Sequence, residues 1–403
     1  MNLPLNALFV AFASAVSALA QWLIVIFLGR IEGPVALGSY SLAQSWVLVL
    51  SYFSMLAFRQ QVLAGNLGVY SFSSLFWTRF LFSLLLFLPV VVIVYFFSDY
   101  LYFYLFLCAV VYKFSDLLID LLSVWYQAAK KFFFLATVSV LRLLFVMSFF
   151  VVSYYCGLGL VVSFLLMLVS AFIFAFVFDF RFLNLRFFDF LNGFSLSVFW
   201  GLVKTNFWFA ASNVLMVLSF ALLRQLVGFF SDGFVLGYFS ASFQIVTLIS
   251  FFVTATGQIL LPKFGCYFRA SNWAAFSSLL RRIVFLLIVF GLLLVLIALM
   301  FGSEVFVFIY GAAFLDGYPI LIFVFVSAVP MFVASVVGAS AYAAGSKSIM
   351  LKGYFYSLFS LLILGGFLGY FFGVFGVLFA FSAVMIFQSF YFYFVIKKLM
   401  HGI

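Results

Sequence analysis

Three ionisable side chains stand close together in one long apolar stretch. Lys113, Asp116 and Asp120 follow the spacing i, i+3, i+7 within residues 101–126, which places them on one face of a helix. A charged side chain in the middle of a membrane helix costs roughly 2.5–3.5 kcal/mol, so such residues usually face a partner or a cavity. Two interpretations stay open. The cluster either neutralises itself and holds two helices together, or its single net negative charge binds a proton or a sodium ion.

Composition requires that the helix around these charges lies in lipid. Of 403 residues, 69% are hydrophobic and 7% are charged, with a mean hydropathy of +1.39, whereas a soluble domain carries about 25% charged residues. In lipid the backbone must satisfy its own hydrogen bonds, as a helix or a closed barrel does. The apolar runs, for example 76–97 and 283–301, last about 20 residues and therefore predict helices rather than the ten-residue strands of a barrel.

The sequence gives little indication of disulfides, metal sites, histidine-based catalysis or nucleotide binding. Cys108, Cys156 and Cys266 form no spaced pair, and the one histidine is His401. The chain therefore shows neither a disulfide framework nor a zinc site, and no histidine-based catalysis is expected. No phosphate-binding loop of the form G-x-x-x-x-G-K-S/T is present. We expect a protein that is not an enzyme, with no catalytic residues, no bound metal and no organic cofactor.

The apolar runs predict an all-α polytopic membrane protein with about twelve transmembrane helices. Ala18-Leu19-Ala20 looks like a signal-peptidase site, but the first four residues carry no basic side chain and the apolar run continues to Leu28. We therefore expect an uncleaved first helix. The predicted spans are 5–28, 37–63, 75–97, 101–126, 134–155, 158–178, 200–227, 234–262, 281–301, 317–343, 351–372 and 374–396.

The charges between these spans are distributed unequally. If the N-terminus is cytoplasmic, most basic residues fall in cytoplasmic connections, and Arg30 joins the acids on the other side. The cytoplasmic set is Lys130, Lys131, Arg181, Arg186, Lys263, Arg269, Arg281, Arg282, Lys347, Lys352, Lys397 and Lys398, and the opposite acids are Glu32, Asp99, Asp232, Glu304 and Asp316. This positive-inside pattern predicts cytoplasmic termini. It also accounts for most of the net charge of +10, so nucleic acid is not an expected partner.

The second half of the sequence repeats the first. Seven residues are followed by an identical residue 199 positions later, between Gly228 and Phe252. They are Gly29, Leu37, Gly38, Ser41, Val47, Ser51 and Phe53. Tyr126-Gln-Ala-Ala-Lys130 is echoed by Tyr342-Ala-Ala-Gly-Ser-Lys347. We therefore predict two pseudo-symmetric six-helix lobes, an N-lobe of residues 1–190 and a C-lobe of residues 191–403. Two such parallel repeats predict a substrate path through a central cavity between them.

Several of these segments resemble a known family. The stretch from Leu28 to Gln44 is similar to the first loop of Wzx-type flippases, which belong to the multidrug/oligosaccharidyl-lipid/polysaccharide superfamily. Val235–Ser242, Leu260–Lys263, Tyr310-Gly311 and Ala343–Lys347 add to the resemblance. The resemblance implies a cavity lined by the first, second, seventh and eighth helices. It also implies movement of undecaprenyl-diphosphate-linked O-antigen units across a bacterial inner membrane.

In that interpretation, basic residues in the spans would bind the diphosphate, since arginine can hold phosphate oxygens with two hydrogen bonds. The candidate cations are Arg59, Lys204, Arg224, Arg30 and Arg142. The alternative is that these side chains reach the interface and contact lipid headgroups. Candidate sugar contacts are Gln21, Gln44, Asn206, Asn213, Trp22, Trp46 and Trp208. The polar ones could instead make hydrogen bonds between helices, and the tryptophans could form interfacial belts.

Four other functions remain as alternatives. An O-antigen polymerase or ligase would need a large outer loop with catalytic arginine or histidine. A cation-coupled multidrug antiporter of the same superfamily would need acids in the cavity. A lipid II flippase would need two more helices, and a channel would need a filter motif. We expect a monomeric transporter whose partners are the lipid-linked oligosaccharide and membrane lipids, with a polymerase and chain-length regulator of the same pathway nearby.

Overall fold

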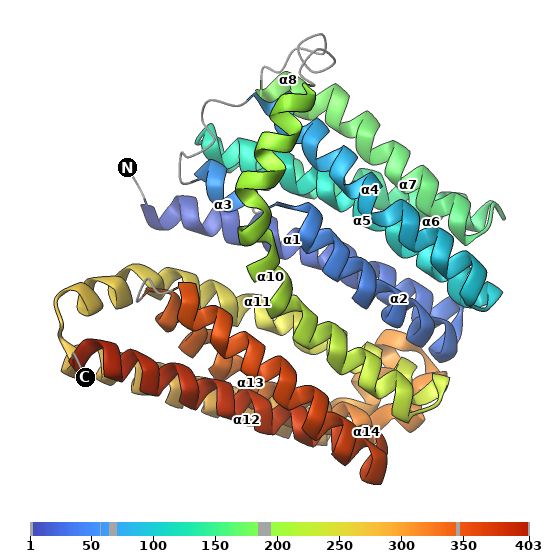
Figure 1. Ribbon diagram of the computed structural model, residues 1–403. Coiled ribbons are helices and arrows are strands. Elements are labelled where there is room, and N and C mark those ends of the chain that lie inside the picture. Colours follow the sequence, from blue (N-terminus) through green and yellow to red (C-terminus); the bar gives the residue numbers. More distant parts are fainter. Residues whose placement is uncertain (1–2, 57, 64–70, 184–194, 344–346, 402–403) are drawn as a thin grey trace. The chain divides into compact units, whose positions relative to one another are not determined.

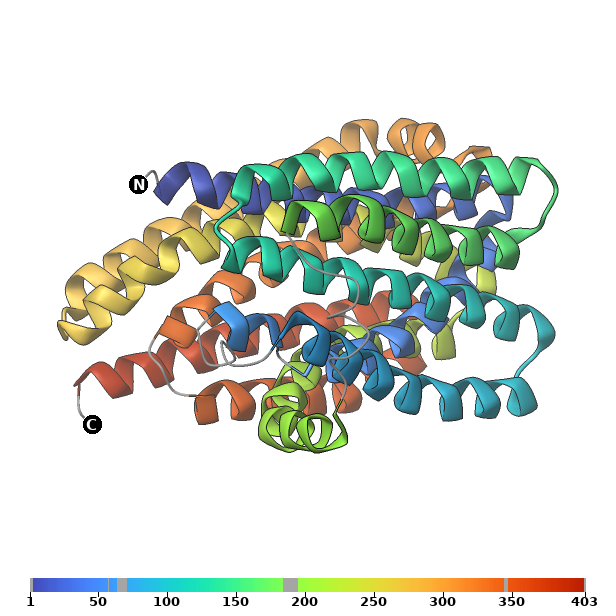
Figure 2. The ribbon, with the colours of Figure 1, turned by 90° about the horizontal axis from the view of Figure 1, so that it is seen from above.

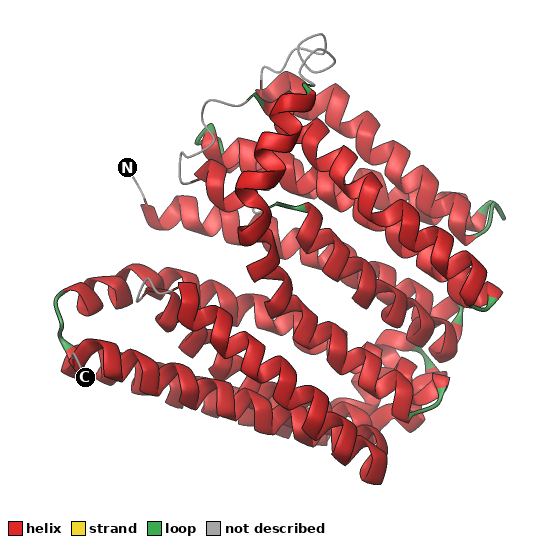
Figure 3. Ribbon diagram, viewed as in Figure 1, coloured by secondary structure: helices red, strands yellow, loops and turns green. Residues whose placement is uncertain are grey.

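The structure, a computed structural model, describes residues 3–56, 58–63, 71–183, 195–343 and 347–401 (Figure 1). Helices make up nearly all of these ranges, and no strand occurs in them (Figure 3). Apolar side chains in lipid leave the backbone no solvent partner, so each segment satisfies its amide and carbonyl groups along its own helix. The expected all-α fold class is confirmed.

Each predicted span coincides with a helix. The six of the first half are α1 (Leu3–Ile31), α2 (Gly33–Ser54) with α3 (Phe58–Leu63), α4 (Phe72–Phe97), α5 (Tyr100–Ala128), α6 (Phe132–Tyr155), and α7 (Leu160–Phe174) continued by η1 (Ala175–Asp179) and α8 (Phe180–Leu183). The second half contains α10 (Leu196–Phe230), α11 (Gly233–Arg269), α12 (Trp273–Tyr310), η2 (Ala312–Gly317), α13 (Tyr318–Ala343) and α14 (Lys347–His401).

Two backbone breaks explain where the helices and the predicted spans differ in number. The expected span 37–63 is interrupted at Leu56, whose φ of 48° lies in the left-handed region, so α3 is a separate short helix. α14 holds the last two spans, which are divided at Gly373, whose φ of 57° and ψ of −138° are not helical. Glycine adopts this conformation at little cost because it has no Cβ.

Nine helices in the described ranges are long and apolar enough to cross a membrane. They include α14, which contains two spans, and they omit only α2 and α5 among the predicted segments. α5 carries three charged residues, and α2 is rich in Gly, Ser and Gln. The chain is therefore a multi-pass membrane protein, and charged residues within a helix such as α5 are expected to face polar groups.

The chain forms two compact units. Unit 1 comprises residues 1–21 and 43–217, and unit 2 comprises residues 22–42 and 218–403. α1, α2 and α10 each contribute residues to both units. This division groups residues by packing and does not test the predicted N-lobe and C-lobe boundary at residue 190, which lies outside the described ranges and stays a prediction.

In unit 1, α7 packs against both α5 and α6, and α4 packs against α5 (Figures 1 and 2). One apolar cluster, which includes Leu56, Phe58, Phe76 and Leu121, joins the α3 region to α4 and α5. Aromatic rings supply much of this contact, as where Phe72 meets Trp125 edge-on with ring centres 5.3 Å apart. Such pairs add to the stabilisation that comes from buried area.

In unit 2, α13 packs against α11, α12 and α14 (Figure 1). Small residues allow close approach between these helices, as expected where lipid removes the hydrophobic drive for association. Gly291 of α12 faces Val329 of α13. Ser382 of α14 donates to Ser327 of α13 over 3.0 Å.

The repeated glycine segments contact each other within unit 2. A Cβ on Gly38 would lie 3.0 Å from the carbonyl oxygen of Gly233, and one on Gly237 would lie 2.1 Å from the carbonyl oxygen of Pro34. Gly237 and Gly233 are the repeat counterparts of Gly38 and Pro34, each 199 residues later. The contact is therefore reciprocal, which is the arrangement that a two-fold relation between the repeats produces.

This close approach predicts that Gly237→Ala destabilises the protein, because the added methyl would strike backbone that cannot rotate away. We expect a cost of about 1–3 kcal/mol, seen as a lower apparent melting temperature in detergent. Gly201→Ala is the control, since nothing lies within 4 Å of that Cβ and alanine is the better helix former. Equal melting temperatures for the two variants would contradict the contact.

Candidate functional site

The predicted charged residues of α5 belong to a larger group that we call the charge cluster: Arg59, Arg79, Lys113, Asp116 and Asp120. Lys113 Nζ lies 2.7 Å from Asp116 Oδ2. Asp120 pairs with two arginines, through Oδ1 to Arg59 at 3.2 Å and through Oδ2 to Arg79 at 2.9 Å. Helices α3, α4 and α5 therefore meet through ionic contacts as well as through apolar packing.

Arg59 reaches α5 because the chain turns after α2. Ser51 and Ser54 donate to carbonyls of their own helix near its end, and the left-handed Leu56 then redirects the backbone. Leu56 and Phe58, both fully buried, anchor α3 in the apolar cluster. The side chain of Arg59 keeps 39% of its surface exposed, so it is the accessible member of the arginine pair.

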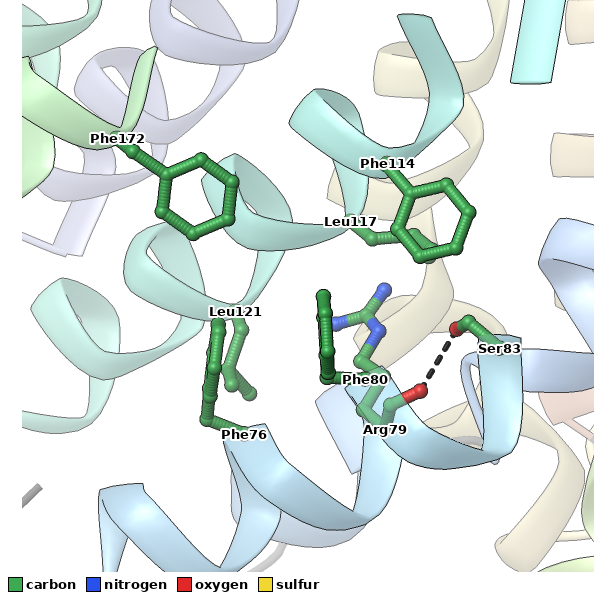
Figure 4. A pocket seen from close by; sticks show the side chains of 8 residues that line it. All are labelled: Phe76, Arg79, Phe80, Ser83, Phe114, Leu117, Leu121 and Phe172. Carbon is green, nitrogen blue, oxygen red and sulfur yellow. Dashed lines mark hydrogen bonds between the residues drawn. The ribbon is translucent and has the colours of Figure 1, made fainter. Parts of the chain in front are cut away.

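Arg79 is a member of the cluster that the sequence patterns did not single out. It lies two turns into α4, which begins after Ser71 caps the amide of Ser74, and its side chain is only 4% exposed. Figure 4 shows its guanidinium within a small pocket of aromatic and aliphatic side chains. The pocket is lined by Phe76, Arg79, Phe80, Ser83, Phe114, Leu117, Leu121 and Phe172. Its volume of about 10 Å³ is room for roughly one water molecule.

The two arginines change the electrostatics of the predicted site. Lys113, Asp116 and Asp120 alone sum to a charge of −1, which is the reason for predicting a bound proton or sodium ion there. The charge cluster contains three basic and two acidic residues and sums to +1. Both oxygens of Asp120 already accept from arginine, so the cluster favours an anion more than a cation. The ion-coupling role of these residues stays a prediction.

A second buried ion pair lies elsewhere in unit 1. Arg142 of α6 is 2.6 Å from Asp179 Oδ1, which also accepts from the Tyr126 hydroxyl at 3.1 Å. Asp179 ends the π-helical turn η1 and is fully buried. The Arg142 guanidinium lies 5.6 Å from the ring centre of Phe174. The charge of Arg142 is thus matched inside the unit, and its role in substrate binding stays a prediction.

A buried arginine of unit 2 has different surroundings. Arg224 of α10 is 7% exposed, and its guanidinium lies 5.2 Å from the ring centre of Phe243 in α11. It makes no ion pair with a described residue, and its Nε has no hydrogen-bond partner there. The aromatic face offers a weak cation–π contact, which leaves most of the charge available to an anion.

The remaining basic and tryptophan candidates are placed in both units. In unit 2, Arg30 donates to the carbonyls of Ile309 and Phe308, and Trp22 donates to the Tyr310 hydroxyl over 3.2 Å. Both side chains therefore connect α1 to the end of α12, and their roles in substrate binding stay predictions. In unit 1, Lys204 is exposed and makes no ion pair with a described residue, so it stays a candidate for binding.

The uncharged polar candidates of unit 1 differ in burial. Gln44 is buried and its Nε2 finds no partner among the described residues. Asn206 is also buried, donates to the carbonyl of Leu202 and leaves Oδ1 without a described partner. Gln21 and Asn213 are half-buried, and Trp46 is exposed. Trp208 lies in α10, but its side chain is outside the described part. Among the buried candidates of the described part, Gln44 and Asn206 each have a side-chain polar atom without a hydrogen-bond partner.

Comparisons by sequence return nothing: no protein-family model matches the chain, and no curated protein does. Comparisons by structure do. The chain is similar to the lipid II flippase MurJ in its inward closed conformation, with a TM-score of 0.74 and 17% identity over 97% of this chain and 87% of that one.

Two further similar structures are transporters. The Vibrio cholerae MATE transporter VcmN in its bent form matches with a TM-score of 0.57 and 14% identity over 98% of this chain and 97% of that one. A transporter of the MOP superfamily from Pyrococcus furiosus matches with a TM-score of 0.60 and 13% identity, over 98% of this chain and 96% of that one. At these identities the likeness shows the fold, so the chain has the fold of MOP-superfamily transporters.

The buried pair in unit 1 yields a stability prediction. Arg142→Met should lower the melting temperature strongly, because it leaves the Asp179 carboxylate buried without a counter-charge, a change that costs about 3–5 kcal/mol. Arg142→Met combined with Asp179→Leu removes both charges and should recover most of that loss. If the double variant is less stable than the single one, the pair does not act as described.

Proposed function

We propose that this protein is a flippase that carries a lipid-linked oligosaccharide from the cytoplasmic to the periplasmic leaflet of a bacterial inner membrane. In this proposal the carrier is undecaprenyl diphosphate, both termini are cytoplasmic, and transport proceeds by alternating access. The diphosphate would bind intramembrane cations, the sugar would pass through a polar cavity, and the polyprenyl tail would stay in lipid.

One observation carries the proposal: within the predicted spans, the charged residues that make no ion pair with a described residue are basic. The acids Asp116, Asp120 and Asp179 each pair with a basic residue, whereas neither Lys204 nor Arg224 makes an ion pair with a described residue. A diphosphate brings two or more negative charges into a place that water reaches poorly, and such charges need fixed cations with hydrogen-bond donors. Arg59, Arg224 and Lys204 have donors to give.

The fold comparisons support a carrier of this general kind. One of the similar structures is named a lipid II flippase, so a protein of this fold moves a lipid cargo. Another similar protein is described as a MOP-superfamily transporter whose reversed binding-pocket polarity suggests a different function. Pocket charge is therefore a reasonable guide to cargo within this fold. A carrier of cationic drugs would need unpaired acids in its cavity, whereas Asp116, Asp120 and Asp179 each form an ion pair with a basic residue.

The primary test is deletion of the gene in its host, followed by lipid extraction and mass spectrometry. We expect single undecaprenyl-diphosphate-linked sugar units to accumulate and surface polysaccharide to disappear. A change in polymer length with single units still reaching the periplasm would instead indicate a polymerase or its partner. If neither changes, the multidrug antiporter becomes the leading interpretation.

Substitution of the cations should reproduce the deletion in graded form. Arg59→Ala, Lys204→Ala and Arg224→Ala should each reduce complementation by about tenfold, the value of one charge-assisted hydrogen bond. None of the three leaves an acid without a partner, since Asp120 keeps Arg79, so all should fold. Lys352→Gln, which removes an exposed charge near the start of α14, is the matched control. Full activity in all three alanine variants would reject a role for these cations in binding the diphosphate.

A further inference from the structure

The carboxylate of Asp120 is shared between two arginines in an unequal way. Its Oδ2 binds Arg79 at 2.9 Å, and Arg79 is 4% exposed. Its Oδ1 binds Arg59 at 3.2 Å, and Arg59 is 39% exposed. Asp120 itself is 18% exposed. The Asp120–Arg79 contact is thus buried and short, and the Asp120–Arg59 contact is accessible and longer.

This gradient determines which contact an incoming anion can replace. The two contacts use one N–H of each guanidinium, while arginine has five donors arranged to hold two oxygens at once. An ion pair that water reaches contributes little, about 0–1 kcal/mol, and in the proposed function the exposed side of Arg59 faces the aqueous cavity. The Arg59 contact can therefore open at small cost. The Arg79 contact is shielded from water and should persist, which keeps Asp120 in place.

We propose that Asp120 is an internal substitute for the phosphate of the substrate. It occupies Arg59 while the site is empty, gives up that arginine when a diphosphate arrives, and remains held by Arg79 so that it can return when the cargo leaves. This inference rests on the proposed function, because it assumes that Arg59 contacts the lipid-linked diphosphate. Asp120 would be a specificity-determining residue rather than one that binds the cargo.

The arrangement has a consequence for selectivity. Membrane phospholipids carry phosphodiester groups with one negative charge, and they surround the protein in great excess. A diphosphate carries at least two charges and presents more acceptor oxygens to the arginine fork. Because the Asp120 carboxylate already binds Arg59, any anion must bind this arginine strongly enough to displace the carboxylate. The diphosphate, with more charge and more acceptor oxygens, gains most from this displacement. Asp120 would thereby exclude common lipids and admit the diphosphate.

The test uses purified full-length protein in phosphatidylcholine nanodiscs, with farnesyl diphosphate as the probe and farnesol as the probe without phosphate. Asp120→Asn should bind farnesyl diphosphate about fivefold more tightly than the wild type, because Arg59 is released from a partly exposed ion pair. Adding phosphatidylglycerol, an anionic phosphodiester lipid, to the discs should compete in this variant and have little effect on the wild type.

Two matched variants separate this mechanism from a general change in charge. Asp99→Asn removes an exposed acid at the start of the same helix, where its side chain makes no capping hydrogen bond, and should leave both measurements unchanged. Asp116→Asn removes an acid one turn from Asp120 that pairs with Lys113 instead of an arginine. If it tightens binding as much as Asp120→Asn does, local charge explains the effect and the substitute role is wrong.

A second variant tests the proposal if Asp120→Asn does not fold. Should Asp120→Asn be unstable because Arg79 loses its partner, Asp120→Asn combined with Arg79→Met removes the buried charge as well and still frees Arg59. Tighter binding by this double variant supports the proposal, and unchanged or weaker binding overturns it. If the wild type binds farnesyl diphosphate but Asp120→Asn gains nothing, Asp120 is not a substitute and the flippase proposal stands. If no variant prefers farnesyl diphosphate to farnesol, both fail.

Discussion

The cost of holding charge in an apolar environment organises unit 1. Each acid inside its described helices forms an ion pair with a basic residue. Most of these ion pairs connect neighbouring helices. Arg59 ties α3 to α5, Arg79 ties α4 to the same carboxylate, and Arg142 ties α6 to the end of η1. Burial of apolar surface alone gives little drive for helix association in lipid, because lipid tails are as apolar as the side chains. The ion pairs fix which turns of neighbouring helices face each other.

Most of the fold follows from composition and run length. Apolar stretches of membrane-spanning length predict the helices, and all the predicted spans coincide with helices in the described part. Many helix ends also follow from the sequence, since Gly and charged residues interrupt the apolar runs. The break at Leu56 was not predicted, because leucine carries no signal for a left-handed backbone. Gly373, by contrast, stands at the predicted boundary between the last two spans.

The candidate site was harder to predict. Periodicity placed Lys113, Asp116 and Asp120 on one face of α5, and Lys113 does pair with Asp116. The partners of Asp120 come from other helices, and no spacing rule connects Arg59 or Arg79 to it. A survey of every charge within the predicted spans or next to their ends would have included Arg79, in the span 75–97, and Asp179, one residue beyond the span 158–178. Their pairing would still have required the packing of α4 against α5 and of α6 against α7.

The reciprocal contact between Pro34–Gly38 and Gly233–Gly237 has the form of a homodimer interface that now lies within a single chain. In a homodimer every substitution appears twice, so a helix that acquires a charge acquires it on both sides of the axis. Duplication and fusion remove that restriction. α5 carries three charged residues, while α13, the helix of the same order in the second half, carries none. A fused duplicate can thus be symmetric in shape and asymmetric in charge, because each half can place its charged residues independently of the other.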